Sequence, residues 1–466
     1  MILYLIISIL VASLAMLART KGHVKIVGGV FHLLQFSALA ALITGVATTE
    51  YNFDLFEFDK LGTLFYLLLT IVGVFVFIHS DASLKRDSLS EYKLYYTLLM
   101  FLECAIAGVY FSSNIAITWI FLEATTLCAA GIVYHRRTEE TLEATWKYIF
   151  VCSTGIAMAY LGILLLCSVA EGGSLGYDAL AERIQEGNPL FLKIAFLLVL
   201  SGYSCKMEIF PLYTVGIDAN FAAPSPAGAL ISTGLVNAGF LAIFRTYELF
   251  SATPIFEWAK SVMLIVGLLS LAIGAFFLRR TNNYKRFLSY STVENMGLVA
   301  IGLGIGGIGA WAAIFHVVCH TFIKSSLFLQ IGVVAQIYNS CRINRLGEYL
   351  SVNRVGAIAL LIGTVVLLAF PPSPLFISEL MLFKSLFMDG SWWLAVVMLV
   401  LMCVVIYSVA GRVIRLCYQP SQNQADMSAV NKTLSWSALL LLIIAMVLGL
   451  WQPTILTDII TEIVTF

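Results

Sequence analysis

Ionisable side chains stand in the middle of several long apolar stretches of this sequence. Glu123 lies in ITWIFLEATTLCAAG, Lys206 in LVLSGYSCKMEIFPLY and Lys324 in FHVVCHTFIKSSLFL. A charge at the centre of a bilayer costs at least about 2.5–3.5 kcal/mol, so such groups normally pair with one another or line a wet cavity. Groups that gain and lose protons in such a place could carry them across a membrane.

A second polar group comes from the segment HVVCHTFIK, in which His316, His320 and Lys324 recur every four residues. Residues with this spacing share one face of a helix, so they should form a polar stripe that protons could follow. Glu379 adds an acid in the next apolar stretch. The predicted proton-translocation residues are therefore Glu123, Lys206, His316, His320, Lys324 and Glu379, with Glu103, Glu208, Asp218 and Asn237 as additional candidates.

Several of these groups also have a purely structural interpretation. A neighbouring hydroxyl could hold Glu103 by a hydrogen bond, and Glu208 could cap a helix end or face water beside Pro211. Lys384 follows the apolar core of its stretch and could extend to the membrane interface. These interpretations stand beside the functional ones for the three residues.

The composition identifies the elements that must position these groups. The chain has 466 residues, of which 60% are hydrophobic and 12% are charged, whereas about 25% of the residues of a soluble domain are charged. Apolar runs of about 20 residues, each long enough to cross a bilayer as a helix, recur throughout. We therefore predict an all-α polytopic membrane protein with about 14 spans, centred near residues 10, 36, 69, 103, 123, 158, 202, 237, 268, 299, 322, 366, 400 and 442.

Lysine and arginine are unevenly distributed among the predicted loops. With the N-terminus outside, the inward loops hold nineteen of these residues and the outward loops hold five. Because cytoplasmic loops are enriched in lysine and arginine, we expect both termini on the outer side of the membrane. The net charge of zero gives no indication of nucleic-acid binding, and the nine cysteines form no C-x-x-C pair that would suggest a metal site.

Prolines interrupt two of the predicted spans, at Pro211 and in the segment FPPSP. Proline breaks a helix, and broken helices at membrane depth are tolerated only where they line a cavity or pack on protein. Paired interruptions are typical of transporters built from inverted repeats. We predict a single membrane domain over residues 1–466, with helices 1–3 in residues 1–94, a five-helix repeat in 95–250, an inverted second repeat in 258–418 and the last helix in 432–466.

Several stretches resemble the antiporter-like membrane subunits of complex I, of group 4 membrane-bound hydrogenases and of Mrp-type cation/proton antiporters. The likeness runs from about residue 95 to 395, and EATTL is the version typical of component F of hydrogenase-4-type complexes. WIFLEATTL resembles the family's glutamate helix and GYSCKMEIFPLYTVGIDANFAAPSP its lysine helix. NNYKRFLSYSTVENMG, FHVVCHTFIKSSLFL and PPSPLFISELMLF are similar to three further motifs of the second repeat.

The resemblance implies a role for each matching position. Glu123 and Lys206 match the family's paired glutamate and lysine, Lys324 its central lysine, His320 the neighbour of that lysine, and Glu379 the terminal ionisable group. Three asparagines stand where relatives carry titratable residues, so the relay would need ordered water there: Asn220, Asn237 and Asn295. Glu103 and Glu208 are acids that the family's pattern does not include.

The function that the resemblance implies is ion translocation as a subunit of a redox-driven complex, with protons favoured over sodium and sodium left open. The implied partners are other membrane subunits and a peripheral arm with iron–sulfur and NiFe-type subunits, in a prokaryotic inner membrane. The chain itself is expected to hold no cofactor, no metal and no catalytic site. Two alternatives stay open: a subunit of a secondary cation/proton antiporter or inorganic-carbon uptake system, and a non-pumping scaffold subunit.

Overall fold

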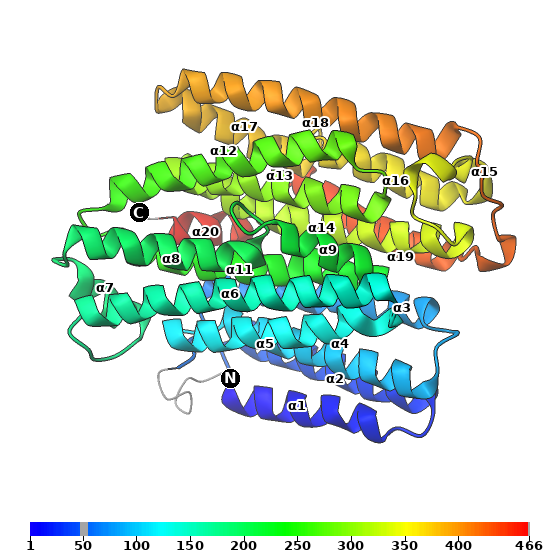
Figure 1. The fold of residues 1–466 in the computed structure, drawn as a ribbon, viewed down its shortest axis with the longest axis horizontal. Coiled ribbons are helices and arrows are strands. Elements are labelled where there is room, and N and C mark those ends of the chain that lie inside the picture. Colours follow the sequence, from blue (N-terminus) through cyan, green and yellow to red (C-terminus); the bar gives the residue numbers. More distant parts are fainter. Residues whose placement is uncertain (47–54, 465–466) are drawn as a thin grey trace. The chain divides into compact units, whose positions relative to one another are not determined.

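A computed structural model describes residues 1–46 and 55–464, and long α-helices dominate it (Figure 1). The helices pack into two compact units, one formed by Met1–Ala227 with Gly234–Ala259 and the other by Gly228–Thr233 with the chain from Lys260 onward. Eleven of the described helices are long and apolar enough to cross a membrane. The chain is therefore a polytopic helical membrane protein, as predicted.

The first unit begins with α1 (Ile2–Leu17), α2 (Lys21–Ile43), α3 (Lys60–Ser83), α4 (Leu89–Tyr110) and α5 (Ile115–Val133). The chain continues through the short η1 (Tyr134–Arg136), α6 (Glu139–Val169), α7 (Tyr177–Ile184), α8 (Pro189–Met207), α9 (Thr214–Ala222) and α11 (Val236–Leu249). Between α9 and α11, α10 (Ser225–Leu230) and the π-helical turn η2 (Ile231–Leu235) contribute to both units.

The second unit contains α13 (Tyr284–Ile305), α14 (Ile308–Tyr338), α15 (Tyr349–Val352), α16 (Arg354–Leu367), α17 (Pro374–Met388), α18 (Trp392–Tyr418), α19 (Lys432–Leu450) and α20 (Thr454–Ile463), with the short turns η3 (Ile343–Arg345) and η4 (Met427–Ala429). Most of α12 (Phe256–Arg280) also belongs to it. Most of α14 is buried, so the polar side chains of its middle turns lie in the interior.

The helices coincide with the predicted spans, although the number of crossings stays a prediction. A helix is present near every predicted centre, but those near residues 10, 299 and 366 fall on helices that are shorter or less apolar than the eleven. Apolar side chains on α1, α2 and α18 are exposed, which suits helices that contact lipid. The inverted relation of two five-helix repeats likewise stays a prediction.

Both predicted interruptions are present. Helix α8 ends at Met207, Glu208 adopts a left-handed conformation with φ of 59°, and a cis Phe210–Pro211 bond precedes α9. Helix α16 ends at Leu367, Ala369 has φ of 51°, and a cis Pro371–Pro372 bond precedes α17. Proline cannot donate to the preceding turn, which accounts for a break at each place.

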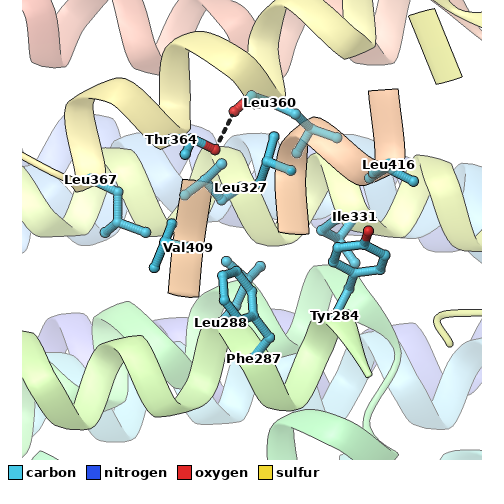
Figure 2. A pocket seen from close by; sticks show the side chains of 11 residues that line it. Tyr284, Phe287, Leu288, Leu327, Ile331, Leu360, Thr364, Leu367, Val409 and Leu416 are labelled. Atoms are coloured by element: carbon cyan, nitrogen blue, oxygen red, sulfur yellow. Dashed lines mark hydrogen bonds between the residues drawn. The ribbon is translucent and has the colours of Figure 1, made fainter. Parts of the chain in front are cut away.

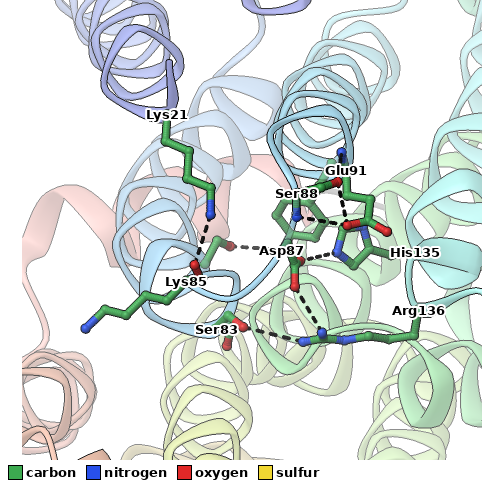
Figure 3. Close-up of polar contacts among 10 residues, drawn as sticks. Lys21, Ser83, Lys85, Asp87, Ser88, Glu91, His135 and Arg136 are labelled. Atoms are coloured by element: carbon green, nitrogen blue, oxygen red, sulfur yellow. Dashed lines mark hydrogen bonds and ion pairs between the residues drawn. The ribbon is translucent and has the colours of Figure 1, made fainter. Parts of the chain in front are cut away.

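A polar cluster joins the α3–α4 turn to the end of α5 (Figure 3). Asp87 in the turn contacts the His135 ring at 2.7 Å and the Arg136 guanidinium at 3.2 Å. Ser88 and Glu91 form a capping box that begins α4. These contacts fix one end of α4 and α5, the helices that carry Glu103 and Glu123.

Candidate proton-translocation site

In the first unit, the Thr126 hydroxyl connects Lys206 with Glu123. The Lys206 Nζ donates to Thr126 Oγ1 at 2.8 Å and to Thr125 Oγ1 at 3.2 Å, and Thr126 Oγ1 lies 3.2 Å from Glu123 Oε2. Ser153 on α6 donates to the other carboxylate oxygen at 3.1 Å. A hydroxyl can accept from an ammonium and donate to a carboxylate at once, so Thr126 fits between these charges.

The two ends of this arrangement differ in their surroundings. Lys206 is 2% exposed, and its Nζ lies 5.5 Å from the centre of the Tyr148 ring and 3.5 Å from its hydroxyl. Glu123 is only half-buried. The three described contacts of the ammonium are with hydroxyls, and none is an ion pair with Glu123.

Helix packing explains why Lys206 is so enclosed. A Cβ on Gly202 would lie 2.4 Å from the Gly155 carbonyl, so α6 and α8 are in backbone contact just before the lysine. On the other side, a Cβ on Gly239 of α11 would lie 2.4 Å from the Met207 nitrogen. Close approach of this kind requires glycine and surrounds the last turn of α8 with protein.

Two of the additional candidates, Glu208 and Asp218, lie at the α8–α9 break. Glu208 is 2% exposed, and Asn220 Nδ2 donates to its Oε1 at 3.2 Å. Asn220 and Glu208, two of the positions at which the sequence was expected to depart from the family's pattern, thus contact each other. Asp218 is half-buried on α9, and Asn237 is buried in α11.

In the second unit, Asn295 connects His316 with a buried acid. His316 Nε2 lies 2.9 Å from Asn295 Oδ1, and Asn295 Nδ2 donates to Glu294 Oε2 at 2.5 Å. The other ring nitrogen, Nδ1, lies 2.9 Å from the Ser378 hydroxyl on α17. The result is a polar chain across α13, α14 and α17 that ends one residue before Glu379.

Lys324 contacts α13 at a point further along the same face of α14. Its Nζ donates to the Leu288 carbonyl at 2.6 Å and to the Ser291 hydroxyl. His320 is fully buried, and neither ring nitrogen has a hydrogen-bond partner among the described residues. Its ring stacks 6.4 Å from that of His316. Buried polar atoms are nearly always satisfied, so these nitrogens mark where a water or a mobile proton would bind.

The polar partners of the charged groups were not identified from the sequence. Thr126 is one helical turn after Glu123 in the motif EATTL, so the signal was present for that hydroxyl. Glu294 was overlooked although STVENMG places it beside Asn295, and it is 4% exposed. For Ser153 and Ser378 the sequence carries no comparable signal. Glu379, which was predicted, lies on α17 and is 8% exposed.

Two cavities are of different character. One lies among α13, α14, α16 and α18 and is lined by apolar residues such as Phe287, Leu327 and Val409 (Figure 2); its volume is about 10 Å³, too small and apolar for a water chain. The other, about 290 Å³, is a polar cleft of the first unit. Its lining includes Asp59 and Arg245, which form an ion pair at 2.9 Å. Among the described residues, no three His, Cys, Asp or Glu side chains are grouped as metal ligands.

The family described as NADH:quinone oxidoreductase/Mrp antiporter, TM, matches residues 112–406, more than half of the chain. The chain belongs to this family. A hydrogenase-4 component F homolog of Methylacidiphilum infernorum is 30% identical over 349 residues, which cover 71% of this chain and 72% of that protein.

Other relatives are longer than the region they share with this chain. The Na(+)/H(+) antiporter subunit A1 of Staphylococcus aureus strain Newman is 28% identical over 70% of this chain and 42% of its own length. The chloroplastic NAD(P)H-quinone oxidoreductase subunit 5 of Citrus sinensis is 26% identical over 80% of this chain and 50% of its own length. The chain thus spans half or less of these two proteins.

Solved structures share the fold of this chain. A chain of the membrane-bound sulfane sulfur reductase, an archaeal respiratory membrane complex, has a TM-score of 0.86 at 22% identity and covers 98% of this chain and 95% of its own. A chain of the Mrp complex from Dietzia sp. DQ12-45-1b has a TM-score of 0.85 at 17% identity, with coverage of 99% and 96%. Both belong to multi-subunit membrane complexes.

Proposed function

We propose that this chain is a proton-translocating subunit of a redox-driven membrane complex. The observation that carries the proposal is the connection of the buried Lys206 ammonium to the Glu123 carboxylate through the Thr126 hydroxyl. Family membership supports it, because relatives include a hydrogenase-4 component F homolog and a quinone oxidoreductase subunit.

The chemistry follows from desolvation and charge. A negative Glu123 stabilises the ammonium of Lys206, which otherwise has only hydroxyl and aromatic partners. When that carboxylate is neutralised, burial favours release of the lysine's proton. A change of charge at Glu123 would thus drive proton uptake and release at Lys206.

The second unit supplies groups suited to a further segment of the path. His316, His320 and Lys324 share a face of the enclosed helix α14, and the unpartnered nitrogens of His320 lie between the other two along it. We place Glu379 at the end of this segment because it lies on α17 directly after Ser378, which contacts His316.

The proposed setting is a prokaryotic plasma membrane, with both termini outside. The proposed partners are other membrane subunits and a peripheral arm that carries iron–sulfur and NiFe-type centres. Affinity purification through a tag on this chain, followed by mass spectrometry and iron and nickel analysis, tests this assignment. Recovery of antiporter subunits without iron or nickel would contradict it.

The Glu123→Gln complex, reconstituted in liposomes, tests the function itself. The substitution keeps the shape of the side chain and removes its charge, so proton translocation should fall while assembly is retained. Lys147 and Glu143 form an exposed pair at 2.5 Å on α6, and Glu143→Gln serves as the matched control. Translocation by Glu123→Gln at the wild-type rate would overturn the role of the pair.

A second candidate is a subunit of a cation/proton antiporter, which the Staphylococcus aureus relative favours. The two functions differ in what drives the protons. A redox-driven subunit acidifies or alkalinises the vesicle only when the electron donor is supplied, whereas an antiporter responds to a sodium gradient alone. Proton movement driven by sodium without any electron donor would select the antiporter.

A further inference from the structure

A separate group of buried ionisable side chains lies among α1–α4. Glu103 on α4 is fully buried, and Gln35 and His32 on α2 lie beside it at 0% and 6% exposure. Gln35 Nε2 donates to Glu103 Oε2 at 2.8 Å, and Gln35 Oε1 lies 3.0 Å from His32 Nδ1. His32 Nδ1 is itself 3.9 Å from the carboxylate.

Among the described residues, no fixed cation contacts Glu103. In the described part of the chain, no lysine or arginine contacts the carboxylate, and the other titratable groups that face it are neutral at ordinary pH: Tyr4 on α1, Tyr66 on α3, and Tyr95 and Cys104 on α4. The backbone of α3 closes the site, because a Cβ on Gly73 would lie 2.9 Å from Glu103 Oε2. His32 is the partner that can carry a positive charge.

The hydrogen bonds define which atoms can exchange a proton. Because the Gln35 amide nitrogen faces the carboxylate, its oxygen faces His32, and Nδ1 must carry the hydrogen. That leaves His32 Nε2 and Glu103 Oε1, both buried and both without a hydrogen-bond partner among the described residues. One is a basic nitrogen and the other a carboxyl oxygen, so either atom can bind a proton.

Charge balance determines how many protons the Glu103–His32 pair binds. Without a proton the group has a charge of −1, and with two it has a charge of +1; either state leaves an uncompensated charge in an apolar interior. With one proton it is neutral overall, as a carboxylic acid beside an imidazole or as a carboxylate beside an imidazolium. Desolvation therefore favours the state with one proton.

We propose that Glu103 and His32 form a proton-binding site that holds one shared proton, separate from the Glu123–Lys206 arrangement. The ligand is a proton, and Gln35 is a positioning residue that orients both partners. The site does not depend on the proposed function, because it follows from the contacts of α2 and α4 alone. A static polar cluster, with an ionised Glu103 beside a neutral His32, is the alternative.

Two spectroscopic signals separate these readings in the purified, intact complex. Infrared spectroscopy detects the carbonyl band of a protonated carboxylic acid, and nitrogen NMR of labelled histidine detects an imidazolium. At neutral pH we expect one of the two signals from this pair, equivalent to one proton per chain. Absence of both signals, or presence of both at full intensity (two protons per chain), would overturn the proposal.

Substitutions assign the signals to the pair. Glu103→Gln should remove the carboxylic-acid band or, if the proton resides on the ring, the imidazolium signal of His32. His32→Gln removes the base, so Glu103 should then give a full carboxylic-acid band at neutral pH. Glu143→Gln, at the exposed pair on α6, should change neither signal. An ionised Glu103 in the His32→Gln complex would defeat the proposal even if Glu103→Gln failed to assemble.

Discussion

The Lys206 ammonium and the Thr126 hydroxyl lie 2.8 Å apart, and the same hydroxyl lies 3.2 Å from the Glu123 carboxylate. The Thr125 hydroxyl also accepts a hydrogen bond from Lys206, but it makes no described contact with the Glu123 carboxylate. It donates instead to the Leu122 carbonyl at 2.6 Å. Both threonines therefore bind the lysine, but only Thr126 also contacts Glu123.

Replacing Thr126 with valine should lower proton translocation by about ten- to a hundredfold, because loss of a hydrogen bond to a charged group costs about 1.5–3 kcal/mol. Thr125→Val is the matched control, with the same change in shape, and it should have a smaller effect. Thr126→Ser should restore the wild-type rate. The measurement is dye-reported proton uptake by liposomes; equal rates for Thr126→Val and Thr125→Val would contradict a specific connection to Glu123.

Asn295 should be required for the stability of the second unit. Asn295→Leu leaves His316 Nε2 and Glu294 Oε2 without their described contact, and each stranded buried group costs about 1–3 kcal/mol. Thermal unfolding of the assembled complex should show a lower midpoint. Asn282→Leu, at an exposed position before α13, is the control. An unchanged midpoint for Asn295→Leu would show that other groups satisfy the histidine and the acid.

The sequence predicted the charged groups better than the groups that join them. Lys206 and Glu123 could be found because a charge in an apolar run is rare and costly. Thr126 was overlooked although it stands one helical turn after Glu123. Ser153 could not be assigned, because hydroxyls are common in membrane helices and their role depends on which helix faces meet. The break at Pro211 was predictable from proline chemistry, whereas the left-handed backbone at Glu208 required the structure.

The same distinction applies to the additional acids. Glu103 was recognised as an unusual acid, but its partners His32 and Gln35 come from a helix 68 residues earlier in the sequence. Local periodicity carries no information on such a pairing. The sequence suggested only that Asn220 replaces a titratable group. The structure shows that its amide donates a hydrogen bond to Glu208, a contact that only the tertiary structure reveals.

Lys324 should distinguish a proton relay from a structural clamp. In a relay, Lys324→Met should abolish translocation with little loss of assembled complex, because methionine keeps the unbranched shape of the side chain while removing the group that titrates. In a clamp with Glu379, removing the lysine strands a buried charge at a cost of about 3–5 kcal/mol, and assembly should fail. Lys384→Met, at an exposed lysine, is the matched control. Normal assembly with wild-type translocation would contradict both readings.

Gly216 should be intolerant of a side chain, because its missing Cβ leaves the room that Glu208 occupies. A Cβ there would lie 2.0 Å from Glu208 Oε1, so Gly216→Ala must displace the acid from Asn220. Overpacking of this kind costs about 1–3 kcal/mol, which thermal unfolding of the assembled complex would detect. Gly29→Ala is the control, since no atom lies within 4 Å of its Cβ position, and it should be neutral or slightly stabilising.

The double variant Gly216→Ala with Glu208→Ala should recover most of the lost stability, because the second change removes the clashing carboxylate. If the double variant is no more stable than Gly216→Ala alone, the clash is with the surrounding backbone, and the glycine does not act through Glu208.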